Sequence, residues 1–476
     1  MSKFIDFFKT SSPSATKVAL EKATKFYKKL RFQAFIAATF GYSLYYVCRT
    51  SLNVVKGPII ESGMLNATQL GTIGLCLFWA YAIGKFINGF LADHSNITRF
   101  MAAGLIVSTL ANLILGLTDT LSVSAATANG TIFTIFAIMW GINGWSQSMG
   151  APPAIISLSR WYPLKIRGTY YGFFSASHNF GEFLSFLFVG LLVSAFGWQW
   201  GFFGAAVAGA LGVVLILFWL HDTPESKGLA PIEVLSGEMT QEELDVQNAA
   251  KVQSQEAMEA AKKETSRIQR AVLKNPGVWI LALASAFMYM SRYAINSWGI
   301  LFLEKIKGFS TVEASSIISI NAICGVVGTV LSGWMSDVLF HGDRKYPALV
   351  AGIFEAISLY LFLFGGNSWF VNILAMILFG IAIGVLICFL GGLMAIDIVP
   401  RKATGAALGV VGMASYAAAG IQDVVSGILI DNMATRNAAG EIVQYDFSYV
   451  SWFWIGAATI SFLLPILNWR RKQADI

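Results

Sequence analysis

The sequence predicts an all-α membrane protein with twelve transmembrane helices arranged in two six-helix halves. Three observations indicate this class: an apolar composition, apolar runs of membrane-spanning length, and motifs that recur at a nearly constant offset. Of the 476 residues, 56% are hydrophobic and 13% are charged, whereas a soluble protein carries about a quarter charged residues. Runs of about twenty apolar residues cross a bilayer as helices. Because the runs are continuous rather than alternating, a transmembrane β-barrel is excluded.

The apolar runs define the predicted spans, and the Lys and Arg residues between them define the orientation. With both termini placed inside, the cytoplasmic side receives 26 of the 33 Lys and Arg residues, and the outer side receives four, namely Lys56, Lys305, Lys307 and Arg436. Loops rich in these residues stay in the cytoplasm, so we expect both termini there. The predicted spans are residues 32–57, 67–91, 98–118, 131–158, 168–195, 198–220, 276–303, 312–336, 346–365, 369–396, 403–430 and 447–469.

One long hydrophilic stretch separates the two halves. The predicted regions are a cytoplasmic N-terminal arm (1–31), an N-terminal six-helix bundle (32–220), a cytoplasmic linker (221–275), a C-terminal six-helix bundle (276–469) and a cytoplasmic tail (470–476). The arm is polar and rich in lysine, unlike the apolar core of a signal peptide, and we expect it to lie on the membrane surface. Charged residues from Thr240 to Arg270 predict an exposed helix within the linker.

Two stretches match each other around a central arginine. Residues 46–53 and 289–296 both read Tyr-x-x-Arg-x-x-x-Asn, and they place Arg49 and Arg292 inside apolar spans. An arginine at that depth is costly and is kept mainly for a partner or a function. Its planar fork matches two oxygens of a phosphate or carboxylate, so two arginines from opposite halves can clamp one phosphate dianion. The alternative is that each arginine pairs with a buried acid and staples helices; the candidate acids are Glu182, Glu355, Asp397 and Asp423.

Other landmarks repeat at nearly the same offset as the two arginines. The offset is 243 residues from Arg49 to Arg292, 244 from Asp93 to Asp337 and 237 from Pro163 to Pro400. Such regularity implies two structurally equivalent bundles, an architecture that places a substrate site near the midplane between the halves. Asp93 and Asp337 each end a Gly-x-x-x-Asp turn, and we interpret them as gating residues.

Lys85 and His178 are further basic residues within predicted spans. Lys85 either extends to the cytoplasmic face or provides a third positive group along an anion path. His178 either senses the charge of a bound phosphate or forms a purely structural pair with Glu182, which lies one turn further along the same helix face. Both alternatives stay open for both residues.

Several aromatic and polar residues cluster around the same spans. Tyr46 and Tyr289 each precede an arginine by one turn, and we place both in the site. Gln422 and Asp423 form an unusual polar pair in the eleventh span. They either make a helix-packing hydrogen bond, recognise sugar hydroxyls or provide a counter-charge to Arg292.

Twelve spans, the Gly-x-x-x-Asp turns and a central loop resemble the major facilitator superfamily. Narrower motifs resemble its organophosphate:phosphate antiporter family, which includes transporters of glycerol 3-phosphate and hexose phosphate and a glucose-6-phosphate sensor. These motifs are Gly41-Tyr42-x-x-Tyr45-Tyr46-x-x-Arg49, Tyr81-x-x-x-Lys85-Phe86, Gln147-x-x-Gly150-x-Pro152-Pro153, Ser177-His178-Asn179 and Tyr289-x-x-Arg292-Tyr293. The resemblance implies phosphate binding by Arg49, Arg292, Lys85 and His178, with an accessory set made of Tyr42, Tyr46, Tyr289, Tyr416, Asn179 and Asp423.

The resemblance implies exchange of inorganic phosphate for an organic phosphate ester by alternating access in a bacterial inner membrane. Ala151, Phe174 and Val385 depart from the glycerol-3-phosphate branch, which favours a larger substrate, hexose 6-phosphate. Three alternatives stay open: a glucose-6-phosphate receptor signalling to a membrane sensor kinase, a glycerol-3-phosphate antiporter, and a proton-coupled symporter using Glu182 or Asp423.

The expected partners are these phosphates and the lipid bilayer, with no nucleic acid, and the expected state is a monomer. The four cysteines fall in apolar runs without metal-ligand spacing, and no cofactor or metal is expected. An enzyme is not expected either, because no nucleophile–base set or phosphate loop is apparent.

Overall fold

The computed structural model describes residues 6–118, 125–240, 273–341, 343–400, 404–438 and 442–468, with residues 242–244, 246, 264, 267–268 and 270 of the central stretch. The predicted tail at 470–476 lies outside the described residues, as do most of the predicted linker helix and the side chain of Asp337.

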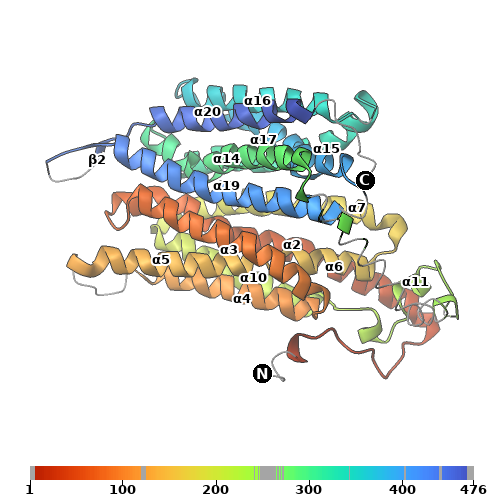
Figure 1. Ribbon diagram of the computed structural model, residues 1–476. Coiled ribbons are helices and arrows are strands. Elements are labelled where there is room, and N and C mark those ends of the chain that lie inside the picture. The colour runs from red at the N-terminus through yellow and green to blue at the C-terminus, as the bar shows by residue number, and fades with distance from the viewer. Residues whose placement is uncertain are drawn as a thin grey trace.

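The described chain is almost entirely helical, and its helices run back and forth between two ends of one bundle (Figure 1). Short π-helical turns at Ser185–Val189 and Phe389–Leu393 join α8 to α9 and α17 to α18, and a third, Met335–Leu339, follows α15. The helices are α2 (Leu20–Glu61), α3 (Ala67–Asp93), α4 (Ile97–Gly116), α5 (Ala125–Gln147), α6 (Ala151–Trp161), α7 (Leu164–Ser175), α8 (Ser177–Leu184), α9 (Gly190–Phe196), α10 (Gln199–Trp219), α11 (Ile232–Leu235), α14 (Pro276–Lys305), α15 (Thr311–Trp334), α16 (Lys345–Phe364), α17 (Trp369–Cys388), α18 (Met394–Asp397), α19 (Thr404–Met433) and α20 (Ser448–Leu463). Strands β1 (Thr435–Arg436) and β2 (Ile442–Gln444) form a small antiparallel ribbon.

Ten helical runs among the described residues are long and apolar enough to cross a membrane. Each coincides with a predicted span, which confirms the all-α membrane architecture. The two other predicted spans correspond to α2 and to α5 with α6. The α2 helix begins at Leu20, inside the predicted arm, and the fourth span is interrupted between Gln147 and Ala151. The two prolines that follow Ala151 occupy the first turn of α6, where a missing backbone N–H costs little.

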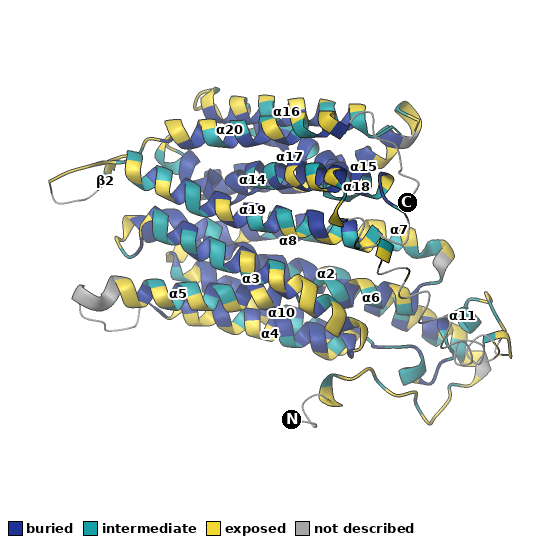
Figure 2. Cartoon of the chain, in the orientation of Figure 1, coloured by how far each residue is buried: buried dark blue, intermediate teal, exposed yellow. Residues whose placement is uncertain are grey.

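The outer faces of the peripheral helices are apolar and exposed. On α16 the exposed side chains include Val350, Ile353, Phe354 and Ile357, which lie on one face at helical spacing. Figure 2 shows such exposed outer faces on α16 and α4. An apolar surface of this extent does not suit water and matches the lipid-facing surface of a helical membrane protein.

The predicted arm and the start of the predicted linker pack together at one end of the N-terminal half. Ser11 N–H donates to the Asp222 carboxylate at 2.7 Å, and Val18 N–H donates to the Gly228 carbonyl at 2.9 Å. We call this the proximal end, and we call the end with Glu61 and the β1–β2 ribbon the distal end.

Helices α3 and α19 form one seam between the halves, and the seam is closed at the distal end. A Cβ on Gly71 would lie 2.3 Å from the Asp423 carbonyl oxygen, and one on Gly427 would lie 2.3 Å from that of Ala67. Toward the proximal end, a Cβ on Gly89 or Gly405 would meet no atom within 4 Å. The two helices therefore touch distally and diverge proximally.

The second seam, between α7–α9 and α15, has the same shape. A Cβ on Gly190 would lie 2.6 Å from the Ser315 Cβ, whereas one on Gly172 or Gly333 would meet no atom within 4 Å. The two halves are thus closed against each other at the distal end and open at the proximal end.

Candidate functional site

Arg49 lies on α2 among aromatic rings. Its side chain is 4% exposed, and its guanidinium carbon lies 4.2 Å from the ring centre of Tyr81 and 5.3 Å from that of Tyr416. Its Nη2 makes a long hydrogen bond of 3.5 Å to the Tyr293 hydroxyl. No Asp or Glu carboxylate of the described chain lies within ion-pair distance of it. Since π faces satisfy a cation only in part, Arg49 retains donors for an anionic ligand.

Two asparagines fix the backbone next to Arg49. Asn112 of α4 and Asn143 of α5 each donate an Nδ2 hydrogen bond of 3.0 Å to the Cys48 carbonyl. Ser51 extends this network with a 2.7 Å bond to Asn112. Because buried amides are costly unless bonded, these contacts fix the rotation of α2 and with it the direction of Arg49.

Arg292 lies on α14 and pairs with Glu182 of the opposite half. Its Nη2 lies 3.0 Å from each Glu182 oxygen, and both side chains are almost fully buried. The acid-pair alternative therefore describes Arg292 in this conformation. The alternative of a Glu182–His178 pair is wrong for this conformation, because Glu182 bonds across the seam while the half-buried His178 ring lies 5.8 Å from the Tyr46 ring.

Tyr416 of α19 links the three basic residues. Its ring centre is 5.3 Å from the Lys85 Nζ and 5.4 Å from the Tyr289 ring, which in turn lies 5.9 Å from the Arg292 guanidinium carbon. Lys85 is exposed and projects from α3 toward α19 on the open proximal side. This geometry favours the anion-path interpretation of Lys85.

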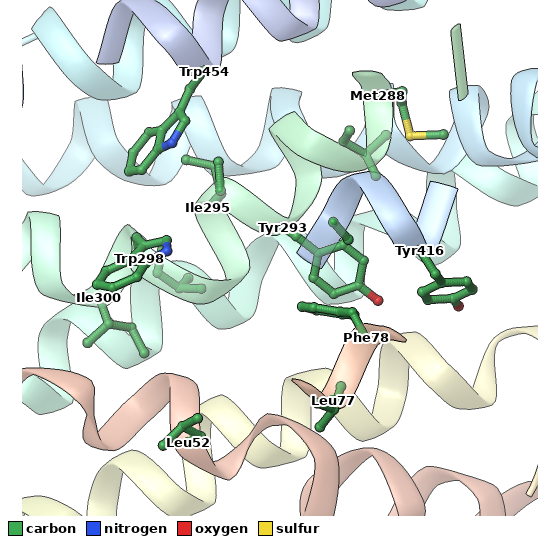
Figure 3. Packing of buried hydrophobic residues seen from close by; sticks show 14 of the residues in the cluster. Leu52, Leu77, Phe78, Met288, Tyr293, Ile295, Trp298, Ile300, Tyr416 and Trp454 are labelled. Atoms are coloured by element: carbon green, nitrogen blue, oxygen red, sulfur yellow. The ribbon is translucent and has the colours of Figure 1, made fainter. Parts of the chain in front are cut away.

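Aromatic contacts join the halves at the level of the arginines. Figure 3 shows Phe78 beside Tyr293, with Tyr416 near them, and the Phe78 and Tyr293 ring centres are 4.6 Å apart. Tyr42 precedes Tyr46 by four residues on α2, and the two ring centres are 5.4 Å apart. The Tyr46 ring centre in turn lies 5.4 Å from the Arg49 guanidinium carbon. The predicted accessory tyrosines are thus brought together with Arg49, Arg292 and Lys85.

The other accessory residues lie away from this cluster. Asn179 is buried and faces α15, where a Cβ on Gly325 would lie 3.3 Å from its Oδ1. Asp423 accepts hydrogen bonds from the Lys56 Nζ at 2.9 Å and from the Ser297 hydroxyl at 2.6 Å. Both members of this ion pair are at most 2% exposed. The alternative of Asp423 as counter-charge to Arg292 is wrong for this conformation.

Lys56 is a residue that the sequence interpretation misplaced. It was assigned to the outer side, yet it is fully buried and its Nζ lies 3.8 Å from the Trp298 ring centre. Lys56 follows Arg49 by seven residues, which is two helical turns on the same face. That spacing was the available signal, and it extends the site toward the distal end.

The proposed gating residues are only partly visible. Asp93 is exposed at the proximal end of α3, and its backbone carbonyl accepts a 3.5 Å hydrogen bond from Arg160 Nη2. The side chain of Asp337 is not among those described. A gating role for either residue stays a prediction.

The cluster carries three positive side chains and, within the described chain, one carboxylate, that of Glu182. Arg49 and Arg292 are buried and Lys85 is exposed on the open side, and this excess of positive charge suits an anion with two negative charges. We predict that Lys85→Ala weakens inorganic phosphate binding about tenfold, because it removes one cation from the open side of the site. Isothermal titration of the purified variant measures this effect, and an unchanged unfolding temperature shows that the fold is intact. Equal phosphate affinity in the variant and the parent would assign Lys85 no part in binding.

Comparisons with known proteins agree with this architecture. The family model described as Major Facilitator Superfamily matches residues 38–422. The chain is 32% identical to the "Probable hexose phosphate transport protein" of Chlamydia muridarum, covering 83% of this chain and 84% of the relative. It is 33% identical to the "Glycerol-3-phosphate transporter" of Bacillus subtilis, with 85% and 87% covered, and 30% identical to the "Membrane sensor protein UhpC" of Salmonella typhimurium, with 83% and 84% covered.

A solved structure shares the fold. A bacterial homologue of the human lysosomal transporter Spinster, in an inward-facing and unoccupied conformation, superposes with a TM-score of 0.70 at 18% identity and covers 94% of this chain and 100% of that chain. The chain therefore belongs to the Major Facilitator Superfamily and, within it, to the organophosphate:phosphate antiporter family whose motifs its sequence carries.

Proposed function

We propose that this protein is a secondary transporter that exchanges inorganic phosphate for hexose 6-phosphate by alternating access. The observation that carries the proposal is the position of Arg49, a buried guanidinium with no carboxylate partner among the described residues, at a seam shared with Arg292 of the other half. A phosphate group bridging these arginines engages both halves at once. Binding can thereby favour closure of the open proximal side.

The proximal end faces the cytoplasm in this proposal. Support comes from the 26 of 33 Lys and Arg residues that fall on the side of both termini. The open proximal seams then correspond to an inward-open state, in which Lys85 is the first cation that a cytoplasmic phosphate meets. We place the protein in a bacterial inner membrane as a monomer, since a single chain provides both six-helix halves, 32–220 and 276–469, and the site residues between them.

Two comparisons support a sugar phosphate as the ester. The matching protein of Chlamydia muridarum is named for hexose phosphate transport. In this chain, small side chains occupy two positions that the glycerol-3-phosphate branch fills with aromatic residues: Ala151 at the start of α6 and Val385 in α17. A smaller side chain leaves more room for a ligand larger than glycerol 3-phosphate.

A second candidate function is reception of glucose 6-phosphate with signalling to a sensor kinase. The similarity to a membrane sensor protein over 83% of this chain favours it. A receptor and a transporter can share the same binding residues. Only a transporter moves the bound phosphate across the membrane, so a transport measurement distinguishes the two functions.

Uptake of labelled phosphate into proteoliposomes preloaded with glucose 6-phosphate, glycerol 3-phosphate or buffer tests the proposal. We expect uptake with interior glucose 6-phosphate to exceed uptake with buffer by about tenfold or more. Uptake supported only by glycerol 3-phosphate would contradict the choice of ester. Binding of glucose 6-phosphate without any exchange would assign the protein to the receptors, and stimulation by a pH gradient alone would indicate a proton symporter.

A further inference from the structure

Glu182 is the one carboxylate among the described residues that contacts the basic cluster. It comes from α8 of the N-terminal half and reaches Arg292 of the C-terminal half, with both of its oxygens 3.0 Å from Nη2. It is 1% exposed. Among the described residues it has no second cation at ion-pair distance, so its charge is directed at Arg292 alone.

Arg292 is only partly engaged by this contact. One nitrogen, Nη2, bonds to Glu182, whereas Nε and Nη1 have no acceptor in the described part of the chain. The guanidinium therefore keeps one edge for a ligand while its other edge holds the carboxylate. A ligand phosphate that takes the full fork of Arg292 must compete with Glu182, because both are oxygen acceptors for the same planar group.

The charge of the cluster sets the consequence of that competition. Without Glu182, a departing ligand would leave the buried Arg49 and Arg292 as uncompensated cations in a region of low dielectric constant, with the exposed Lys85 nearby. Leaving such charges unpaired is costly, so release would be slow. A carboxylate that returns to Arg292 as the ligand departs compensates part of the positive charge.

We propose that Glu182 is a resident counter-anion of the phosphate site. It holds Arg292 while the site is empty, yields this arginine to the phosphate group of the incoming ligand, and takes it back on release. The inference rests on the proposed function, and it separates affinity from turnover: Glu182 lowers affinity for phosphate and raises the rate of exchange. If the Glu182–Arg292 ion pair only held the two halves together, removal of the Glu182 carboxylate would leave the affinity for phosphate unchanged or would weaken it.

The other buried acids do not share this position. Asp423 pairs with Lys56, two helical turns farther toward the distal end. Glu355 is fully buried and bonds to the hydroxyls of Ser291 and Ser461, with no cation at ion-pair distance among the described residues. Glu355→Gln is therefore a matched control, since it removes an equally buried carboxylate that does not face the site.

The test compares Glu182→Gln, Glu182→Asp and Glu355→Gln with the parent protein. Isothermal titration with inorganic phosphate measures affinity, and exchange in proteoliposomes measures the maximal rate. For Glu182→Gln we expect the Kd to fall about tenfold and the maximal exchange rate to fall by a similar factor. Glu355→Gln is expected to keep the parent Kd. Glu182→Asp retains the charge at shorter reach and is expected to give an intermediate Kd.

Two results would overturn the inference while leaving the proposed function in place. One is a folded Glu182→Gln protein whose Kd for phosphate equals or exceeds that of a parent that does bind phosphate. The other, which decides the matter if Glu182→Gln does not fold, is a Glu182→Asp protein with a parent-like or higher Kd. A parent protein that binds neither phosphate nor glucose 6-phosphate would instead reject the proposed function, and the inference with it.

Discussion

Replacement of Arg49 by lysine is expected to reduce phosphate exchange at least about a hundredfold, a loss of about 3 kcal/mol. Because the substitution keeps the positive charge, the loss of exchange activity measures the contribution of the planar guanidinium geometry. The guanidinium of Arg49 is flat, and it lies near the rings of Tyr81, Tyr416 and Tyr46. A compact ammonium cannot reproduce that packing or offer two parallel donors to a phosphate. We expect Arg292→Lys to abolish most exchange for the same reason.

Exchange of labelled phosphate in proteoliposomes measures this loss. Arg99→Lys is the matched control, because Arg99 is exposed at the proximal end, where its Nη1 donates a 2.7 Å hydrogen bond to the Phe7 carbonyl. The control is expected to exchange phosphate at the parent rate. Parent-like exchange by Arg49→Lys would mean that charge alone suffices at this position and would remove the two-arginine clamp from the mechanism.

The sequence predicts those site residues that are recognisable from their position within a predicted membrane span. A charge inside an apolar run is visible without any structure, and this identified Arg49, Arg292 and Lys85. The two halves were likewise visible from repeated offsets. In the structure Arg49 and Lys85 each lie 5.3 Å from the Tyr416 ring centre, and Arg292 is connected to that ring through Tyr289.

The parts that the sequence does not predict are the partners across the seams. Lys56 and Asp423 are 367 residues apart in the chain, and nothing local links them. Glu182 was associated with His178 because neighbours one turn apart on a helix can be recognised from spacing, whereas a partner on another half cannot. Lys56 lies at the very end of the predicted span 32–57 and was therefore counted with the outer side, but α2 continues to Glu61.

The Lys56–Asp423 pair carries the second large expected effect. Both side chains are buried, they connect α2 of one half with α19 of the other, and Ser297 bonds to both of them. Removing one member leaves an uncompensated buried charge, so Lys56→Met and Asp423→Asn are each expected to destabilise the protein by about 3 kcal/mol. Equilibrium unfolding in detergent measures the change. The surface pair Lys305–Glu61 also joins the halves at the distal end, and Lys305→Met is expected to cost at most about 1 kcal/mol.

The double variant Lys56→Met/Asp423→Asn distinguishes an ion pair from two independent polar contacts. With no charge left unpaired, it is expected to lose much less stability than the two single variants combined, which is the signature of coupled residues. The amide that replaces the Asp423 carboxylate keeps a partner in the Ser297 hydroxyl, whose oxygen lies 2.6 Å from the Asp423 Oδ1. Additive losses would show that each residue stabilises the seam separately. Strong coupling would establish that the distal end is held closed by a charge pair, which must separate each time the site opens to that side.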